Sequence, residues 1–232
     1  MVKTPSIMIP ESEKTGDLKQ DLLNRAKSIE SLKIQGRLKI SNRTSKFPSF
    51  NCAIWFFSKK GKLLLRIRGS GPFGVTVFDL LADRREVWIY LPQQGKILKG
   101  NTFFTDYGNI SVDKAIRLME MCLNPWSPAR YCSPMRLLKN GSNGIASLVC
   151  CLFGQDITLS YRLPGLTPII FDSGLTSITF STSQELEADA YPREISFLLK
   201  NDGIKGTLSI REIKFNNLSP NSPIFDRALF SH

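Results

Sequence analysis

The chain has 232 residues, of which 42% are hydrophobic and 22% are charged, a composition that is typical of a globular protein and excludes a disordered one. Lysine and arginine number 31 against 20 aspartates and glutamates, and the net charge of +11 favours anionic partners such as nucleic acid, lipid headgroups or acidic proteins. The single histidine is the last residue, His232, which excludes a Ser-His-Asp or Cys-His catalytic site and a histidine-rich zinc site.

The first part of the chain predicts an arm followed by a helix. Residues 1–16 are polar and contain two prolines, which is typical of a flexible N-terminal arm. Within residues 17–32 the apolar positions recur with the period of one helical face, and Asp17 is a suitable N-cap. No run approaches the about 20 apolar residues of a membrane-spanning helix, and residues 1–30 lack the apolar core of a signal peptide. The helical stripe consists of Leu18, Leu22, Ala26, Ile29 and Leu32.

After this helix the apolar period changes to two, which predicts strands. Turn signals such as Lys60-Gly61 and Asp83-Arg84 separate the candidates, and the loops are too short for βαβ crossovers, so the strands are predicted to be antiparallel. The predicted strands of this half are 34–40, 50–57, 62–68, 74–81 and 86–91.

A second helix and a second set of strands follow. Residues 112–123 show an apolar helical face that Ser111 caps and Asn124-Pro125 ends. About ten strands with two helices predict an α+β fold, in which helices cover one face of a large curved antiparallel sheet. The strands of this half are predicted at 146–153, 156–163, 176–181, 194–199 and 206–215, before a tail with apolar anchors at positions 224, 225, 229 and 230.

The five cysteines form no C-x-x-C motif, which excludes zinc-ribbon and thioredoxin-type sites. Cys150 and Cys151 are adjacent, so a strand would point their side chains to opposite faces. Cys122 and Cys132 flank a short proline-containing loop and are candidates for a disulfide in an oxidising compartment. Two buried thiols are the alternative for this pair.

The segment 63–81 places an aromatic side chain at the tip of a glycine- and proline-rich turn. Turn tips are usually solvated, so an apolar tip needs a reason. Basic residues occupy the strand before the tip and the turn before that strand, and an apolar tip with a basic flank is typical of a membrane-surface contact. The alternative is that the ring folds back onto the core. The predicted membrane-contact residues are Pro72, Phe73, Gly74, Arg66 and Arg68.

The same segment resembles the lipoprotein carrier superfamily of LolA and LolB, and is most similar to LolB, the outer-membrane lipoprotein receptor. In that superfamily a leading helix enters a strand with a Gly-basic-apolar pattern, seen here as Gly36-Arg37-Leu38. A Pro-Leu-Gly loop then precedes a strand of threonine and apolar residues, seen here as Pro72-Phe73-Gly74 followed by Val75-Thr76-Val77-Phe78. The resemblance covers residues 17 to about 100, and the chain departs from the superfamily in its greater length and its cysteines.

The resemblance implies a half-open β-barrel over residues 17–232, as one carrier domain whose apolar cavity holds the acyl chains of a lipid or lipoprotein. It implies binding without catalysis, cofactor or metal. The expected location is the periplasm or the periplasmic face of the outer membrane, with a lipid anchor in the native form. An anionic membrane surface and a periplasmic carrier protein are the further expected partners, and Phe73 would contact the membrane at delivery.

If the fold is of this type, the cavity is lined by one face of each strand and by the lid helix. Ordinary core packing is the alternative for each lining residue, because a pocket and a core have the same composition. Both faces of several early strands are apolar, and this excess favours a cavity. The predicted lining residues are Ile54, Phe56, Leu65, Ile67, Phe78, Trp88, Tyr90, Ile116 and Met119.

Three other classes of function were weighed. An envelope structural or interaction protein would use the same fold without a lipid cavity. An enzyme is disfavoured by the lack of an internal histidine. Nucleic-acid binding is disfavoured because no dense basic run or known motif occurs. The match Gly69-x-Gly71-x-x-Gly74 to a dinucleotide loop fails, because a predicted strand rather than a helix follows it.

Overall fold

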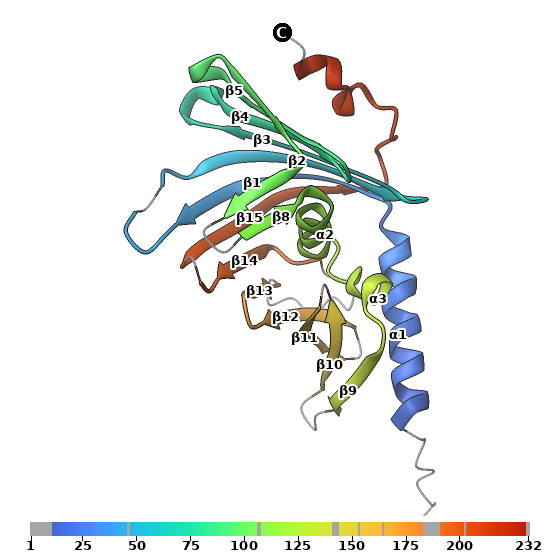
Figure 1. Ribbon diagram of the computed structural model, residues 1–232. Coiled ribbons are helices and arrows are strands. Elements are labelled where there is room, and N and C mark those ends of the chain that lie inside the picture. The colour runs from blue at the N-terminus through green and yellow to red at the C-terminus, as the bar shows by residue number, and fades with distance from the viewer. Residues whose placement is uncertain are drawn as a thin grey trace, which may run out of the picture.

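One strongly curved antiparallel sheet forms the body of the protein (Figure 1). The structure is a computed structural model that describes residues 11–45, 47–105, 108–140, 144–152, 154–163, 165–182, 191–201 and 203–230, apart from a few side chains at their margins. Within these residues the sheet has 13 strands in the order β6-β5-β4-β3-β2-β1-β15-β14-β13-β12-β11-β10-β9, and it is open rather than closed. The strand number is therefore higher than the predicted ten.

The topology consists of two meanders joined through the first and last strands. β1 to β6 form one half, β9 to β15 form the other, and β1 pairs with β15 in the middle of the sheet. The chain leaves one edge of the sheet after β6 and returns at the other edge as β9, and the connection carries the hairpin β7-β8 and the helices α2 and α3. The bounds are β1 (Ser31–Ser41), β2 (Phe50–Lys59), β3 (Lys62–Ser70), β4 (Thr76–Asp83), β5 (Val87–Leu91), β6 (Lys96–Gly100), β7 (Thr102–Thr105), β8 (Gly108–Ser111), β9 (Met135–Asn140), β10 (Ile145–Leu152), β11 (Gln155–Arg162), β12 (Thr167–Ser173), β13 (Thr176–Ser181), β14 (Glu194–Leu199) and β15 (Ile204–Phe215).

The N-terminal helix α1 (Glu11–Ser28) begins and ends earlier than the apolar stripe predicts. Leu32 fits both the helical stripe and the alternation of the following strand, and it lies in β1 opposite Phe56 and Phe215. Sheet pairing therefore decided its conformation. The predicted arm overlaps the first turns of α1, and residues 1–10 lie outside the described residues.

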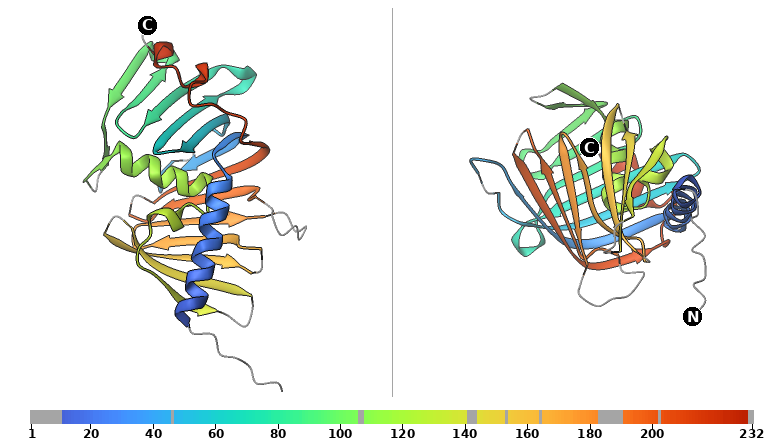
Figure 2. Two further views of the ribbon diagram at one scale, coloured as in Figure 1. Left: turned by 90° about the vertical axis from the view of Figure 1, so that its right-hand side faces the viewer. Right: turned by 90° about the horizontal axis from the view of Figure 1, so that it is seen from below.

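The second helix, α2 (Val112–Leu123), has the predicted bounds. The Ser111 side chain accepts a hydrogen bond from the Lys114 amide at 3.3 Å, which confirms the predicted cap. A short helix that the sequence pattern did not indicate, α3 (Pro128–Tyr131), follows within the proline-containing loop. Figure 2 shows α1 running along one side of the curved sheet, with α2 and α3 inside its curve.

Several of the observed strands were not predicted from the sequence, and their residues explain why. β12 contains Pro168, which cannot donate a ladder hydrogen bond, and Pro168 lies at a register shift opposite Tyr161. β6 is a mostly exposed edge strand with little apolar alternation, and β9 is the opposite edge. The predicted end of β10 at position 153 lies outside the described residues.

A bulge in β15, opposite Gln35 and Gly36 of β1, helps the sheet to curve. The register between β1 and β15 shifts between Gln35 and Gly36. A Cβ atom on residue 36 would lie 2.5 Å from the carbonyl oxygen of Ser209, so glycine is required for this close approach. The glycine of the Gly36-Arg37-Leu38 pattern thus has a structural role.

Apolar side chains cover both faces of the sheet at its β2–β5 end. The large cluster on the concave face includes residues of α1 and α2. A smaller cluster on the opposite face packs against the C-terminal tail, where Phe225 and Phe230 contact the outer side of the sheet. Figure 1 shows α2 and this tail on opposite sides of β3–β5. The tail contains the short 3-10 helices η3 (Pro223–Phe225) and η4 (Arg227–Phe230), and the Leu229 side chain lies outside the described residues.

Candidate functional site

Four of the residues predicted to line an acyl cavity are buried on the concave face. Ile54, Phe56 and Leu65 belong to β2 and β3, and each is at most 4% exposed. Ile116 of α2 lies in the same apolar cluster. These side chains pack into one continuous core, so protein atoms fill the space that the sequence reading assigned to a ligand.

Two of the three further predicted lining residues, Ile67 and Met119, lie at the margin of this cluster. Both are partly buried and pack against it. Phe78 lies nearer the tip of the β3-β4 hairpin, opposite Gly69. A Cβ on residue 69 would lie 2.2 Å from the Phe78 ring, so the glycine makes room for that ring. Phe50 meets Phe78 edge to face, with 6.2 Å between the ring centres.

The prediction that Trp88 and Tyr90 line the cavity is wrong. Both belong to the cluster on the outer face of the sheet, with Phe225 of the tail. The guanidinium of Arg227 lies 4.5 Å from the centre of the Trp88 ring. The second apolar face of the early strands is therefore explained by the C-terminal tail, and it is no argument for a cavity.

Phe73 lies at the tip of the β3-β4 hairpin and is fully exposed, at 103% of its reference area. The alternative that the ring folds back onto the core is therefore wrong. Pro72–Gly74 form a 3-10 turn that the Gly71 amide closes by donating to the Val75 carbonyl at 2.8 Å. Phe73 has φ 61° and ψ 17°, a left-handed conformation that costs a non-glycine residue roughly 1–2 kcal/mol.

Other exposed apolar side chains lie at the same end of the sheet. The antiparallel register brings the loops after β1, β3, β12 and β14 to one end, which is the left edge of Figure 1. We call Phe47, Phe73, Val75 and Leu175 the apolar rim, and they are exposed by 50%, 103%, 58% and 43%. The sequence reading missed Phe47 and Leu175, although each is a large apolar residue within a turn signal.

The predicted basic flank of Phe73 has a different role. Arg66 is buried, so its predicted contact with a membrane does not fit its position. Its guanidinium donates to both oxygens of Asp79, at 2.8 and 2.6 Å, and to the carbonyl of Ile224 in the tail. Arg68 is half exposed and also donates to Asp79, at 2.9 and 2.8 Å. These arginines bind β3 to β4 and hold the tail.

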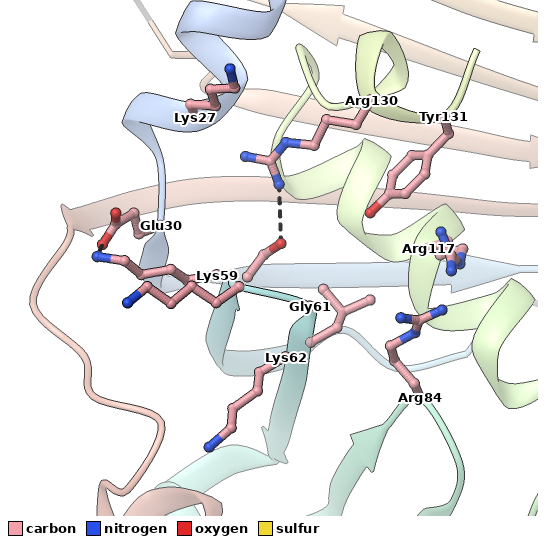
Figure 3. A pocket seen from close by; sticks show the side chains of 12 residues that line it. Lys27, Glu30, Lys59, Gly61, Lys62, Arg84, Arg117, Arg130 and Tyr131 are labelled. Atoms are coloured by element: carbon pink, nitrogen blue, oxygen red, sulfur yellow. Dashed lines mark hydrogen bonds and ion pairs between the residues drawn. The ribbon is translucent and has the colours of Figure 1, made fainter. Parts of the chain in front are cut away.

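The lysines of the β2-β3 turn lie at the other end of β3 from Phe73, at the start of the strand. There they border a pocket of about 490 Å³, which we call the basic pocket (Figure 3). Side chains reach it from α1, α2, α3 and two hairpin turns. Its lining residues are Lys27, Glu30, Ser58, Lys59, Lys60, Gly61, Lys62, Leu63, Arg84, Arg117, Arg130 and Tyr131.

A buried carboxylate organises the floor of the basic pocket. Glu120 of α2 is fully buried and accepts hydrogen bonds from Ser58 at 2.8 Å, from Arg130 at 2.9 Å and from the Tyr131 hydroxyl. Burial and the neighbouring Glu120 carboxylate raise the pKa of Tyr131, so the phenol keeps its proton and acts as a donor. Arg130 also donates to the carbonyl of Ala26 and thereby joins α3 to α1.

A second carboxylate orders the wall. Asp113 accepts from Arg84 at 2.6 Å and from Arg117 at 2.9 Å. Partial burial opposes the charged form of Asp113, yet the hydrogen bonds from the two arginines hold its pKa below the ordinary value. The hydrogen bond to Asp113 likewise raises the pKa of Arg84, against a smaller opposing effect of burial. The wall therefore stays charged at neutral pH.

The predicted disulfide between Cys122 and Cys132 is wrong. Cys132 pairs with Cys150 instead, with 5.3 Å between their Cα atoms. Cys122 is a free thiol, and burial raises its pKa to about 12. Cys150 is buried and Cys151 is exposed, which confirms that adjacent strand residues face opposite sides. The pairing partner of Cys132 was hidden because β10 approaches it only in the folded sheet.

None of the helices in the described part of the chain is long and apolar enough to cross a membrane. No group of three or more His, Cys, Asp or Glu side chains in that part of the chain is placed to hold a metal ion.

Comparison with known proteins supports the fold. No family model matches the sequence, and no curated protein is significantly similar to it. An outer membrane lipoprotein-sorting protein domain from Vibrio parahaemolyticus superposes with a TM-score of 0.65 at 13% identity, covering 95% of this chain and 100% of its own. A DUF1329 family protein from Desulfovibrio piger gives 0.67 at 13% identity, covering 96% and 100%. A LolA superfamily protein from Nitrosomonas europaea gives 0.53 at 15% identity, covering 91% and 98%. The chain therefore shares its fold with these three proteins, which agrees with the prediction of a curved antiparallel sheet.

Proposed function

We propose that this protein is a non-catalytic, LolB-like carrier that binds acyl chains of lipids or lipoproteins and delivers them to the outer membrane from its periplasmic side. The exposed Phe73 side chain is the observation that carries this proposal. Both the exposure of an apolar ring to water and the left-handed backbone of Phe73 are unfavourable for the isolated protein. Such a combination indicates that the ring has a role in binding. An aromatic ring at a membrane interface suits this need.

The rest of the apolar rim supports a membrane contact. Phe47, Val75 and Leu175 extend the exposed apolar surface along the same end of the sheet. Several small contacts in a row bind a bilayer more strongly than one ring, because membrane affinity grows with the apolar area that is buried. The rim would enter the headgroup region while the body of the sheet stays in water.

The acyl chains would enter between α2 and the concave face. Side chains such as Phe56 and Ile116 fill this space, so uptake requires α2 to move away from the sheet. The acyl chain then replaces the lost packing, at about 0.8 kcal/mol per buried methylene. Met119 lies at the margin of the cluster and has the flexible side chain that such a rearrangement favours.

The Cys132–Cys150 disulfide supports a location in the cell envelope. Disulfides persist in oxidising compartments such as the periplasm and are rare in the cytosol. The names of the structural neighbours from Vibrio parahaemolyticus and Nitrosomonas europaea also refer to lipoprotein sorting and to the LolA superfamily.

Liposome flotation tests the membrane contact. The wild-type chain is mixed with anionic vesicles and compared with Phe73→Ser and with the control Leu138→Ser. Leu138 is 61% exposed but belongs to β9, the edge strand at the far end of the sheet order from the β3-β4 hairpin. We expect the wild type and the control to float and Phe73→Ser to remain largely in the dense fraction. Equal flotation of all three would refute the role of Phe73.

An envelope interaction protein without a lipid cavity is the second candidate. The filled concave face, with Phe56 at 0% and Ile116 at 2% exposure, favours it. Titration with a fluorescent fatty acid separates the two functions. A carrier shows saturable binding that an unlabelled acyl chain displaces, whereas an interaction protein with a closed interior shows none.

A further inference from the structure

The basic pocket holds cations that the fold does not neutralise. Within the described residues, Lys27, Lys60 and Lys62 have no carboxylate within ion-pair distance, whereas Lys59 pairs with Glu30 at 2.6 Å. They approach from two elements, since Lys27 is on α1 and the others belong to the β2-β3 turn. Side chains from two separate elements thus border one cavity with uncompensated positive charge.

The charge balance of the cavity is strongly positive. Seven lysines and arginines line it against one carboxylate, Glu30. Asp113 and Glu120 add two negative charges behind the wall and the floor, which still leaves an excess of four cations. Like charges confined in one concave site raise its positive potential, and that potential attracts a multiply charged anion.

Hydrogen bonds hold the arginines at the floor and wall of the basic pocket in place. Arg130 uses its Nη atoms on Ser58, on the buried Glu120 and on the Ala26 carbonyl, so its position is held by three elements. The guanidinium of Arg117 lies 4.8 Å from the centre of the Tyr131 ring and also donates to Asp113. Figure 3 shows these fixed arginines across the cavity from Lys59 and Lys62. Fixed arginines provide the field, and the lysines are free to contact the ligand directly.

We propose that the basic pocket binds the phosphate group of a phosphorylated ligand. A phosphate ester carries between about one and a half and two negative charges and three strong acceptor oxygens, which matches the excess of cations around the pocket better than a single carboxylate does. The volume of about 490 Å³ suits a small phosphate ester or the headgroup of a phospholipid.

This site is distinct from the proposed membrane contact and goes beyond the carrier function. β3 runs from Lys62 at the pocket to Ser70 near the Phe73 turn, and at about 3.4 Å per residue the strand separates the two sites by about 27 Å. A bilayer that holds the apolar rim therefore leaves the basic pocket in water. The phosphate comes either from a soluble ester or from the headgroup of a lipid that is free of this bilayer.

A neighbouring pocket extends the basic surface. It has a volume of about 610 Å³, shares Lys62 and Arg84 with the basic pocket, and adds Arg85 and Arg227. A ligand with more than a phosphate group therefore has room to continue along the end of the sheet. Arg84, Arg85 and Arg227 would contact the rest of such a ligand, whereas Lys62 borders both pockets.

Calorimetric titration with glycerol 3-phosphate tests the proposal. The variant Lys27→Gln/Lys60→Gln/Lys62→Gln is compared with the wild type and with Lys39→Gln/Lys96→Gln/Lys205→Gln, which removes three exposed lysines near the opposite end of the strands. Both variants lower the net charge equally. Thermal melting verifies that both fold. We expect one saturable site in the wild type, a loss of affinity of at least tenfold in the pocket variant, and a change below twofold in the control.

A second titration distinguishes the sources of the phosphate. Dihexanoyl phosphatidic acid, at a concentration where it stays monomeric, presents the same group on a lipid. Equal affinity for both compounds supports a site for the phosphate group itself, and binding of the lipid alone supports a headgroup site. If neither compound binds, or if both triple variants lose affinity equally, the proposal is overturned. Because neither titration includes a membrane or a long acyl chain, such a failure leaves the proposed carrier function standing.

Discussion

The two ends of β3 carry different chemistry. The turn before the strand carries Lys59, Lys60 and Lys62 and borders the basic pocket, whereas the turn after it presents Phe73 to solvent. The two ends favour different partners, because a fully exposed ring suits an apolar surface and a cluster of cations suits an anion. The sequence places these features within 15 residues of each other, yet an extended strand keeps them about 27 Å apart. A basic flank in sequence is therefore not a basic flank in space.

The ion pair in the middle of β3 connects the two ends, and its loss has the largest expected effect. Asp79→Asn leaves the guanidinium of Arg66 buried beside a neutral amide. An uncompensated buried charge costs about 3–5 kcal/mol, so we expect the free energy of unfolding to fall by that amount. Urea denaturation measures the change.

A double variant serves as the control for this ion pair. Arg66→Met/Asp79→Asn removes the buried charge together with its partner, and it should regain at least half of the lost free energy of unfolding. If the double variant is as unstable as Asp79→Asn, the loss comes from something other than the unpaired Arg66.

The next largest effect is expected from loss of the Cys132–Cys150 disulfide, which should affect the end of β3 at the basic pocket and not the end at Phe73. Cys132 follows directly after Arg130 and Tyr131 of the pocket floor, and its disulfide ties that segment to β10. Cys132→Ser/Cys150→Ser opens a link with a sequence separation of 18 residues and should lower the free energy of unfolding by about 3 kcal/mol. Denaturation of the oxidised proteins measures this loss, while flotation through Phe73 should be unchanged. Cys151→Ser, at an exposed free thiol, is the matched control and should be neutral.

A smaller effect is expected at the apolar rim, with the opposite sign. Phe73→Gly relieves the left-handed conformation at φ 61° and should raise the free energy of unfolding by about 0.5–1 kcal/mol while it abolishes vesicle binding. Val75→Gly is the control, because Val75 has an ordinary extended φ of −64° and its replacement should destabilise slightly. Equal stability changes for the two variants would contradict the account of strain at Phe73.

The smallest effect concerns the wall of the basic pocket and depends on pH. The folded-state pKa of Asp113 is lowered, so its pairing with Arg84 and Arg117 stabilises the fold above the unfolded pKa of about 4 and is lost as the pH falls through the folded value. Asp113→Asn should therefore cost roughly 0–1 kcal/mol at pH 7 and nothing near pH 2. Thermal melting at both pH values provides the comparison, with the exposed Asp156→Asn as a control that changes little at either.

Local patterns predicted the elements whose environment the chain itself specifies. The apolar face of α2 and its Ser111 cap indicate both helix ends, because the cap accepts a hydrogen bond from an amide of the first turn, where the helix itself offers no acceptor. β13 and β14 likewise have the predicted bounds. Pro168 concealed β12, since the proline weakens the local strand signal while the neighbouring strands still pair with it.

The candidate site was less predictable, since it depends on which surfaces meet. Trp88 has the same apolar character as Phe56, and only the position of the C-terminal tail decides that it belongs to the outer face. The basic pocket combines α1, α3 and two turns, so no stretch of sequence contains it. Phe73 was found because one short turn carries the whole signal.

By itself the sequence determined the alternation of the strands, the cap of α2, the glycine- and proline-rich turn that carries Phe73 and the excess of positive charge. These follow from backbone geometry and composition over a few residues. The tertiary structure alone decided the pairing of Cys132 with Cys150, the burial of Arg66 against Asp79 and the presence of lysines from α1 and the β2-β3 turn around one pocket. Each of these joins side chains through the register of a folded sheet, and that register is set by the packing of the whole core.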